Sequence, residues 1–132
     1  MGDLQDDGTG GLSRRIIGAG IEVHRALGPG LLEKTYEVCF EAELRHRGIS
    51  AQCQVPLPVV YRDVRLDCGY RIDMLVENTV VVELTVVDKL APVHVSQVLT
   101  YLRLADLRVG LLFNFNVTAL AASGVKRILL DR

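Results

Sequence analysis

The stretch that decides the fold is RIDMLVENTVVVELT, residues 71–85. It holds two apolar runs, as is typical of neighbouring strands. The polar triplet 77–79 separates the runs and predicts a turn. Nearly every residue of 80–87 is apolar, which indicates a central strand that is covered on both faces. The stretch therefore predicts a hairpin whose second strand lies inside a sheet.

Two acids, Asp73 and Glu83, lie on the two strands of this hairpin. Directly opposed residues of an antiparallel hairpin have a constant sum of residue numbers. A three-residue turn pairs Val76 with Val80, and the same sum pairs Asp73 with Glu83, with Cβ atoms about 5 Å apart. A two-residue turn would place the acids on opposite faces instead. The acids are therefore predicted to meet if the turn has an odd length.

The acid pair has two interpretations. Close carboxylates in a half-buried sheet repel each other, so one takes up a proton or a cation lies between them. Mg²⁺ suits such a site, which offers only oxygen ligands. Alternatively, both acids are solvated on an exposed face of the sheet. Glu83 interrupts an apolar run, where an unpartnered charge is costly, and this favours a site.

The rest of the chain predicts a mixed sheet flanked by helices, in the order α-α-β-β-β-α-β-β. Apolar residues at three- and four-residue spacing, with Gly and Pro at the ends, predict helices at 13–27, 31–47 and 92–105. Strands are expected at 52–61, 64–76, 107–115 and 125–130. Pro56 and Pro58 indicate an edge position for the first of these strands.

Composition limits the class of protein. The chain has 132 residues, of which 49% are hydrophobic, enough for one domain with one core. No apolar run approaches the roughly 20 residues of a membrane span, so no membrane association is expected. Residues 1–12 are expected to form a disordered tail that lacks the pattern of a signal peptide. Residues 13–132 would then form a single domain.

Cysteine and charge patterns exclude some functions and leave others open. Cys39, Cys53 and Cys68 are widely spaced and contain no CxxC pair, so neither a zinc site nor a disulfide framework is predicted. Three free thiols fit a reducing compartment, and we expect a cytoplasmic protein. The net charge of −1 gives no global electrostatic argument for binding nucleic acid.

Residues 30–36, GLLEKTY, match the signature G-x-x-E-x-x-Y. Other stretches fit the same family pattern: QVPL at 54–57, VEL at 82–84, PVH at 92–94 and NFN at 114–116. From about Ile16 to Leu129 the chain resembles the GxxExxY family, which is placed in the PD-(D/E)XK nuclease superfamily. The resemblance implies an α/β, restriction-endonuclease-like mixed sheet. Its α-β-β-β-α-β core would carry an extra N-terminal helix and a short C-terminal strand.

The same resemblance implies a metal site for Mg²⁺ or Mn²⁺ and hydrolysis of phosphodiester bonds in DNA or RNA. The implied metal ligands are the carboxylates of Asp73 and Glu83, the Leu84 carbonyl and, as an additional acid, Glu33.

Gln97 and Tyr101 resemble the Q-x-x-x-Y helix of RecB-like nucleases. Residues four apart share one helical face, so both side chains could contact the substrate. A structural polar pair is the alternative.

Thr85 departs from the family pattern. It occupies the lysine position of the E-x-K element, which reads Glu83-Leu84-Thr85. Threonine is neutral and short, and loss of such a charge typically costs roughly 10²- to 10⁴-fold in rate. Lys89 lies about 13 Å further along an extended strand and is not expected to substitute.

Two classes of function therefore remain. The first is an impaired metal-dependent nuclease. The second is a catalytically inactive module that binds nucleic acid or protein, such as a homodimeric scaffold. The apolar edge near Val59 and Val60 is compatible with a homodimer.

Overall fold

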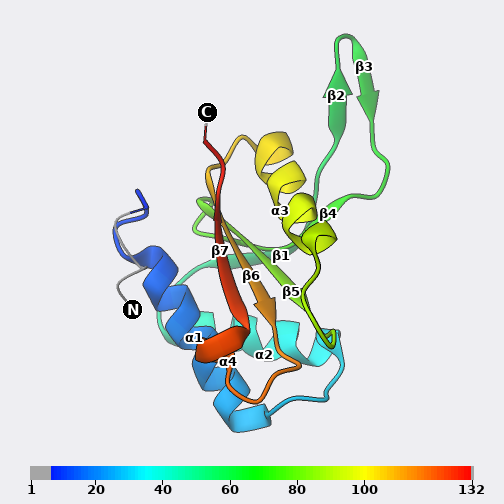
Figure 1. Ribbon diagram of the computed structural model, residues 1–132. Helices are drawn as coiled ribbons and strands as arrows, with labels where there is room; N and C mark the ends of the chain where they lie inside the picture. Colours follow the sequence, from blue (N-terminus) through cyan, green and yellow to red (C-terminus); the bar gives the residue numbers. More distant parts are fainter. Residues whose placement is uncertain (1–6, 132) are drawn as a thin grey trace.

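The computed structural model describes residues 7–131 of the chain, and a five-stranded mixed sheet forms its centre (Figure 1). In spatial order the strands are β1 (Ala51–Pro56), β4 (Arg71–Val76), β5 (Val80–Thr85), β6 (Val109–Asn114) and β7 (Val125–Leu129). β5 and β6 run parallel, and the other neighbouring strands are antiparallel. The predicted central position of β5 and the edge position of β1 are confirmed.

Helices cover both faces of this sheet. α1 (Leu12–Leu27) and α2 (Glu33–His46) pack on one face, and α3 (Pro92–Ala105) packs on the other (Figure 1). Each face has its own apolar cluster because the strands bury side chains on both sides. The short helix α4 (Leu120–Ser123), which precedes β7, was not expected from the sequence. No helix within residues 7–131 has the length and apolar character needed to cross a membrane.

The expectation of two long strands at 52–61 and 64–76 is wrong. β1 ends at Pro56 and β4 begins at Arg71, while β2 (Val59–Tyr61) and β3 (Val64–Leu66) form a separate two-stranded sheet. Pro56 still pairs with Arg71, and the Leu57 N–H donates to the Tyr70 carbonyl at 2.8 Å. The pairing ends at Pro58, which lacks the N–H that a ladder requires. β2 and β3 form a hairpin that projects from the body of the molecule (Figure 1), called here the projecting hairpin.

The N-terminal boundary also differs from the expectation. α1 begins at Leu12, and the Asp7 carboxylate accepts hydrogen bonds from the hydroxyls of Thr9 (2.6 Å) and Ser13 (2.5 Å). The folded chain therefore starts before residue 13. The first six residues of the expected disordered tail lie outside the described residues.

α1 approaches the sheet closely at Gly20. A Cβ atom at this position would lie 2.7 Å from the Phe113 ring and 3.1 Å from the Phe40 ring. Both rings are fully buried, and protein interiors leave little room for an added methyl group. Glycine is therefore required here for helix packing.

Gly20→Ala is expected to lower the free energy of unfolding by about 1–3 kcal/mol, because the methyl group overpacks this contact. The control is Gly18→Ala on the same helix, where only the mobile end of Arg47 lies nearby, at 3.3 Å. The control should gain up to about 1 kcal/mol from helix propensity. Chemical denaturation measures both. Equal stabilisation of the two variants would contradict this account of the packing.

Candidate active site

The β4–β5 hairpin has the predicted register. Val76 pairs with Val80, Leu75 with Val81 and Met74 with Val82. The connecting turn therefore has three residues, 77–79, and the Thr79 N–H donates a hydrogen bond to the Val76 carbonyl at 2.9 Å. Continued by one step, this register brings Asp73 opposite Glu83.

The carboxylates of Asp73 and Glu83 join the two strands where the paired register ends. The Asp73 N–H donates to Glu83 Oε2 at 2.8 Å, and the Leu84 N–H donates to Asp73 Oδ2 at 2.9 Å. Glu83 is only 8% exposed. The alternative interpretation, in which both acids are solvated on an exposed face, does not hold.

The alternation of side chains breaks at Asp73. Ile72 packs in the cluster on the α3 side, whereas Met74, two positions further along the strand, packs in the cluster on the α1–α2 side. On the neighbouring strand β1, Gln54 has a φ of 55°, which lies in the left-handed region. Both strands therefore change face at the same point, which the strict two-residue period of a flat strand does not allow.

A cleft of about 200 Å³ opens beside these acids, between the start of α2, the start of β4, the end of β5, and α3. We call it the acidic cleft. All seven residues predicted for the site line it: Glu33, Asp73, Glu83, Leu84, Thr85, Gln97 and Tyr101. Arg71 and His94 line it as well.

The acids of the cleft disfavour one another's ionised forms. Burial first, and the negative charge of Asp73 second, raise the pKa of the Glu83 carboxyl to about 9. Burial also raises the pKa of Asp73, although the hydrogen bond from the Leu84 N–H lowers it in part. Burial and the charge of Asp73 raise the pKa of Glu33. Without a cation, the cleft therefore retains a proton near neutral pH.

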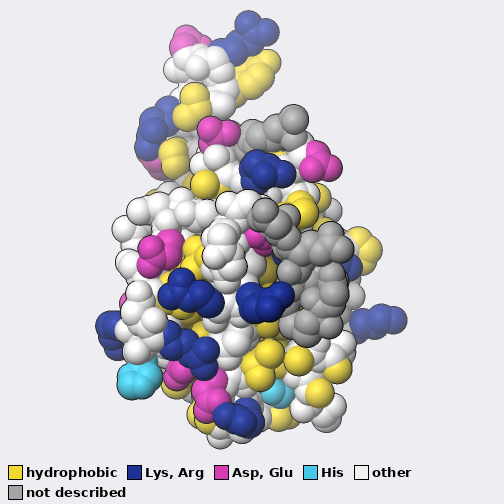
Figure 2. Space-filling model, turned by 90° about the vertical axis from the view of Figure 1, so that its left-hand side faces the viewer, with side chains coloured by type: hydrophobic (Ala, Val, Ile, Leu, Met, Phe, Trp, Pro, Cys, Tyr) yellow, Lys and Arg dark blue, Asp and Glu magenta, His cyan; other side chains and the backbone are white. Residues whose placement is uncertain are grey.

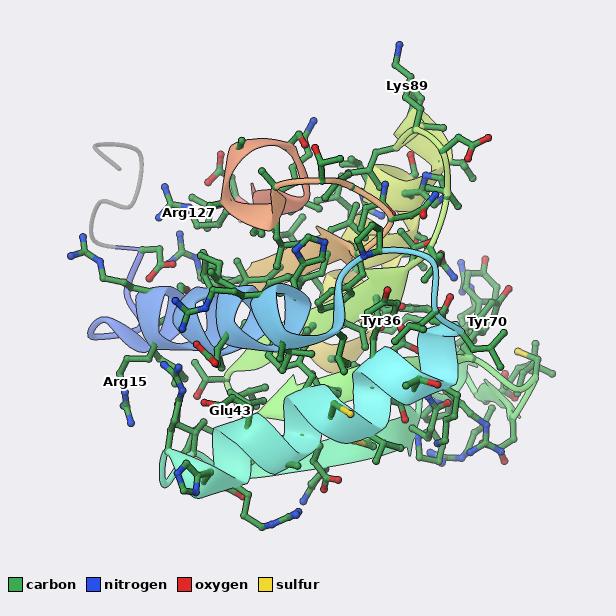
Figure 3. All side chains as sticks on the ribbon, turned by 90° about the horizontal axis from the view of Figure 1, so that it is seen from below. Arg15, Tyr36, Glu43, Tyr70, Lys89 and Arg127 are labelled. Atoms are coloured by element: carbon green, nitrogen blue, oxygen red, sulfur yellow. The ribbon has the colours of Figure 1, made fainter. Side chains whose placement is uncertain are left out.

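The G-x-x-E-x-x-Y motif fixes the start of α2. Glu33 is the first residue of this helix, and Tyr36 lies one turn further on. The Tyr36 hydroxyl donates to the Gly28 carbonyl at 2.5 Å and accepts from the Leu31 N–H at 3.1 Å. Tyr36 is fully buried, and Figure 3 shows it beneath the α1–α2 loop. The tyrosine therefore holds the loop that presents Glu33 and has no direct contact with the cleft.

α3 supplies the opposite wall of the cleft. Gln97 and Tyr101 share a face, as predicted, and Gln97 Nε2 donates to the Tyr101 hydroxyl at 2.8 Å. His94 Nδ1 accepts a hydrogen bond from the Ala91 N–H at 2.8 Å. The neutral imidazole of His94 therefore carries its proton on Nε2.

Two residues beside the acids were missed by sequence reasoning. Glu37 lies one helical turn after Glu33 and is 4% exposed. Its Oε1 accepts from Gln54 Nε2 at 2.7 Å, and the same nitrogen lies 3.4 Å from Asp73 Oδ1. The available signal for Glu37 was a charge inside the buried helical stripe with Phe40. Gln54 gave no comparable signal, because its role depends on the local change of strand face.

Positive charge at the cleft is sparse. Among the described residues that line it, Arg71 is the only lysine or arginine. Thr85 lines the cleft at the lysine position, and Lys89 is exposed and points away from the body (Figure 3). The expectation that Lys89 does not substitute agrees with this geometry. On the face shown in Figure 2, basic and acidic side chains are interspersed.

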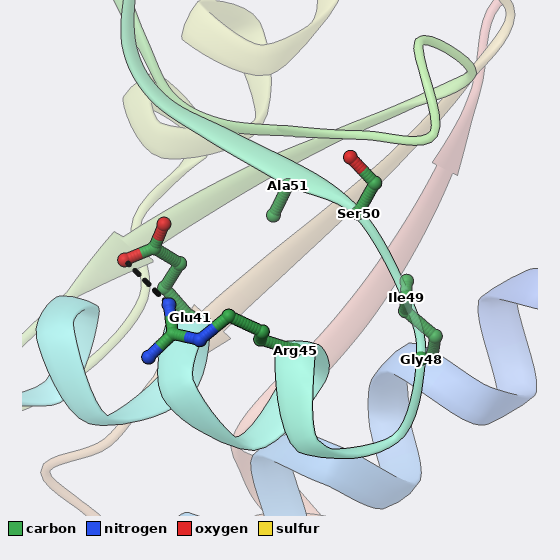
Figure 4. A pocket seen from close by; sticks show the side chains of 6 residues that line it. All are labelled: Glu41, Arg45, Gly48, Ile49, Ser50 and Ala51. Atoms are coloured by element: carbon green, nitrogen blue, oxygen red, sulfur yellow. Dashed lines mark ion pairs between the residues drawn. The ribbon is translucent and has the colours of Figure 1, made fainter.

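A second hollow, of about 340 Å³, lies between the end of α2 and the start of β1 (Figure 4). Its charged groups are Glu41 and Arg45, which form an ion pair at 3.9 Å. Because these charges satisfy each other and no other charged side chain lines the hollow, it offers less chemistry than the acidic cleft.

The family model of the PD-(D/E)XK nuclease superfamily matches residues 11–128. The chain belongs to this superfamily, and its mixed sheet with flanking helices has the restriction-endonuclease-like fold. No curated protein and no solved structure matches the chain.

The oxygen donors of the cleft determine which cation it could hold. No group of three or more His, Cys, Asp or Glu side chains within residues 7–131 has the arrangement of a metal site. Glu33 thus lines the cleft without forming such a group with Asp73 and Glu83. Mg²⁺ usually binds through one or two carboxylates and keeps several waters, so the acid pair alone fits it.

Stability without metal should depend on pH through Glu83. Because its pKa is raised in the folded state, the folded protein binds more protons than the unfolded chain between pH 4.5 and about 9. The unfolding free energy is therefore expected to fall as pH rises through this window, by up to about 1.4 kcal/mol per pH unit. Urea denaturation in EDTA at several pH values measures the slope.

Glu83→Gln is the matched control for this slope. The amide keeps an acceptor for the Asp73 N–H but cannot titrate, so the decline should be much shallower. The same slope in both proteins would assign the pH dependence to another group.

Proposed function

We propose that the protein is a GxxExxY-type, divalent-metal-dependent phosphodiesterase that acts on DNA or RNA and is slowed by Thr85. The observation that carries this proposal is the pair of Asp73 and Glu83, whose carboxylates accept backbone hydrogen bonds across the β4–β5 hairpin in a cleft with Gln97 and Tyr101. A metal-dependent nuclease must bring a cation and a phosphate together, and a pair of confined carboxylates attracts the cation.

Asp73 and Glu83, with the Leu84 carbonyl, would hold Mg²⁺ or Mn²⁺. Glu83 Oε1 has no hydrogen-bond partner among residues 7–131, so it is available as a ligand. Glu33, which is exposed and lines the same cleft, would be an additional acid for the cation. A bound divalent ion lowers the pKa of its water and offsets the charge of the phosphate.

The remaining cleft residues would contact the substrate. The guanidinium of Arg71 can bind phosphate oxygens but cannot act as a base. The hydrogen-bonded pair of Gln97 and Tyr101 faces the cleft and offers polar groups to the same strand of nucleic acid. Thr85 can donate a hydrogen bond but cannot neutralise the charge that develops during hydrolysis.

The second candidate is an inactive module that binds protein or nucleic acid, and the projecting hairpin favours it. Val60, Tyr61 and Leu66 are 61%, 66% and 51% exposed. The hairpin appears at the top of Figure 2, with hydrophobic and charged side chains beside one another. An exposed apolar ribbon is a common feature of interaction surfaces. A homodimer through this hairpin belongs to this second candidate.

The cytoplasmic location is part of the proposal. Cys39, Cys53 and Cys68 are all free thiols. Free thiols are maintained in a reducing compartment, which supports this location.

Restoring the lysine is the sharpest test of Thr85. Thr85→Lys is expected to cleave labelled single- and double-stranded DNA and RNA roughly 10²- to 10⁴-fold faster than wild type with Mn²⁺. Thr100→Lys adds the same charge on the exposed side of α3, outside the lining of the cleft, and should leave the rate unchanged. Asp73→Asn in the Thr85→Lys background should abolish the gain.

Two other outcomes would contradict parts of this proposal. Efficient cleavage by wild type that Asp73→Asn abolishes would keep the nuclease and refute the proposed impairment. A folded Thr85→Lys protein that cleaves none of the substrates would refute the phosphodiesterase and favour the binding module.

A further inference from the structure

Gln54 adopts a backbone conformation that glutamine rarely takes. Its φ of 55° lies in the left-handed region, inside the otherwise extended strand β1. The pairs Cys53–Met74 and Val55–Ile72 flank it, so Gln54 stands opposite Asp73. A glycine or asparagine would adopt this φ more easily. Strained residues of this kind persist where the surroundings require a particular side chain.

The surroundings of the Gln54 side chain are two carboxylates. Its Nε2 donates to Glu37 Oε1 at 2.7 Å and lies 3.4 Å from Asp73 Oδ1. An amide nitrogen carries two hydrogens, so one glutamine can donate to both acids at once. Both contacts are made by the side-chain amide, so neither a small nor an apolar side chain could make them.

Glu37 determines which end of the Gln54 amide faces Asp73. It is 4% exposed, and its second oxygen, Oε2, accepts from Lys34 Nζ at 3.2 Å. An ionised carboxylate only accepts hydrogen bonds, so it binds the nitrogen end of the amide and excludes the oxygen end. The result is a chain of contacts from Lys34 through Glu37 and Gln54 to Asp73.

Both oxygens of Asp73 are then held from different strands. Oδ2 accepts from the Leu84 N–H of β5, and Oδ1 faces Gln54 of β1. A carboxylate held at both oxygens has little freedom to rotate about its terminal bond. Residues that hydrogen-bond to metal-ligating groups orient them in this way, and their loss typically weakens metal binding 10- to 100-fold.

We propose that Gln54, oriented by Glu37, is a positioning residue that sets the direction of the Asp73 carboxylate for a divalent cation. This inference rests on the proposed function, because it assumes that Asp73 binds the metal. It adds a role for two side chains outside the metal ligands and the cleft lining. It also explains why a glutamine is kept in a strained conformation.

The test is calorimetric titration of the full chain with Mn²⁺. Gln54→Asn suits the left-handed conformation, but its amide is one methylene too short to reach both carboxylates. It is expected to bind Mn²⁺ 10- to 100-fold more weakly than wild type, with an unchanged or higher melting temperature. If Gln54 mattered only for folding, its substitution would lower the melting temperature and the affinity for Mn²⁺ together. Gln52→Asn, at an exposed position of the same strand, is the matched control and should bind as wild type does.

Two further variants complete the design. Gln54→Gly accepts the φ without strain and carries no amide, so it should show the same loss of affinity if the asparagine variant does not fold. Glu37→Gln lets the Gln54 amide turn over and should also weaken binding. The double variant Glu37→Gln/Gln54→Asn should bind Mn²⁺ about as weakly as Gln54→Asn alone, because Glu37 acts through Gln54.

Several results would overturn the inference. Wild-type affinity in folded Gln54→Asn or Gln54→Gly would remove the role of Gln54. An unaffected Glu37→Gln would remove the orienting role of Glu37. Absence of Mn²⁺ binding by wild type is a separate result, because it refutes the proposed function itself and the inference with it.

Discussion

The paired register of β4 and β5 ends at Met74 and Val82, and beyond this pair two side-chain carboxylates hold the strands together. Asp73 accepts from the backbone of β5, and Glu83 accepts from the backbone of β4. This exchange draws two acids into the sheet, where burial raises the pKa of both. Several other features depend on it: the change of strand face, the strained Gln54 of β1, and the cleft that α2 and α3 close from opposite sides.

Such an arrangement is costly for a protein that only needs to be stable. Glu33 and Glu37 add negative charge beside the pair, and Lys34 and Arg71 supply the nearby positive charge. Apolar residues of similar size would avoid the burial of several acids. Sites that concentrate like charges and perturbed pKa values are typical of function. A divalent cation would relieve the repulsion. Under the proposed function, Thr85 would leave cation binding intact but slow hydrolysis.

The sequence predicted what depends on local pattern. The length of the 77–79 turn fixed the register of the acids, and the apolar spacing and Pro92 gave the bounds of α3. The break that separates the projecting hairpin from β1 and β4 is not predicted, because two prolines within an alternating run fit an edge strand as well as the end of a strand. Gln54 was missed because its contacts depend on where β1 and β4 change face together, and side-chain periodicity carries no signal for that. Glu37 did carry a signal, because its charge lies inside the buried stripe of α2.

The most direct test of the central claim is a crystal structure of the wild-type protein grown with Mn²⁺, with anomalous diffraction used to locate the ion. The account predicts an anomalous peak between the carboxylates of Asp73 and Glu83, at about 2.0–2.2 Å from one oxygen of each, as for other small hard cations. Absence of a peak in the acidic cleft, in crystals that bind Mn²⁺ elsewhere, would contradict the claim that the buried acid pair is a cation site.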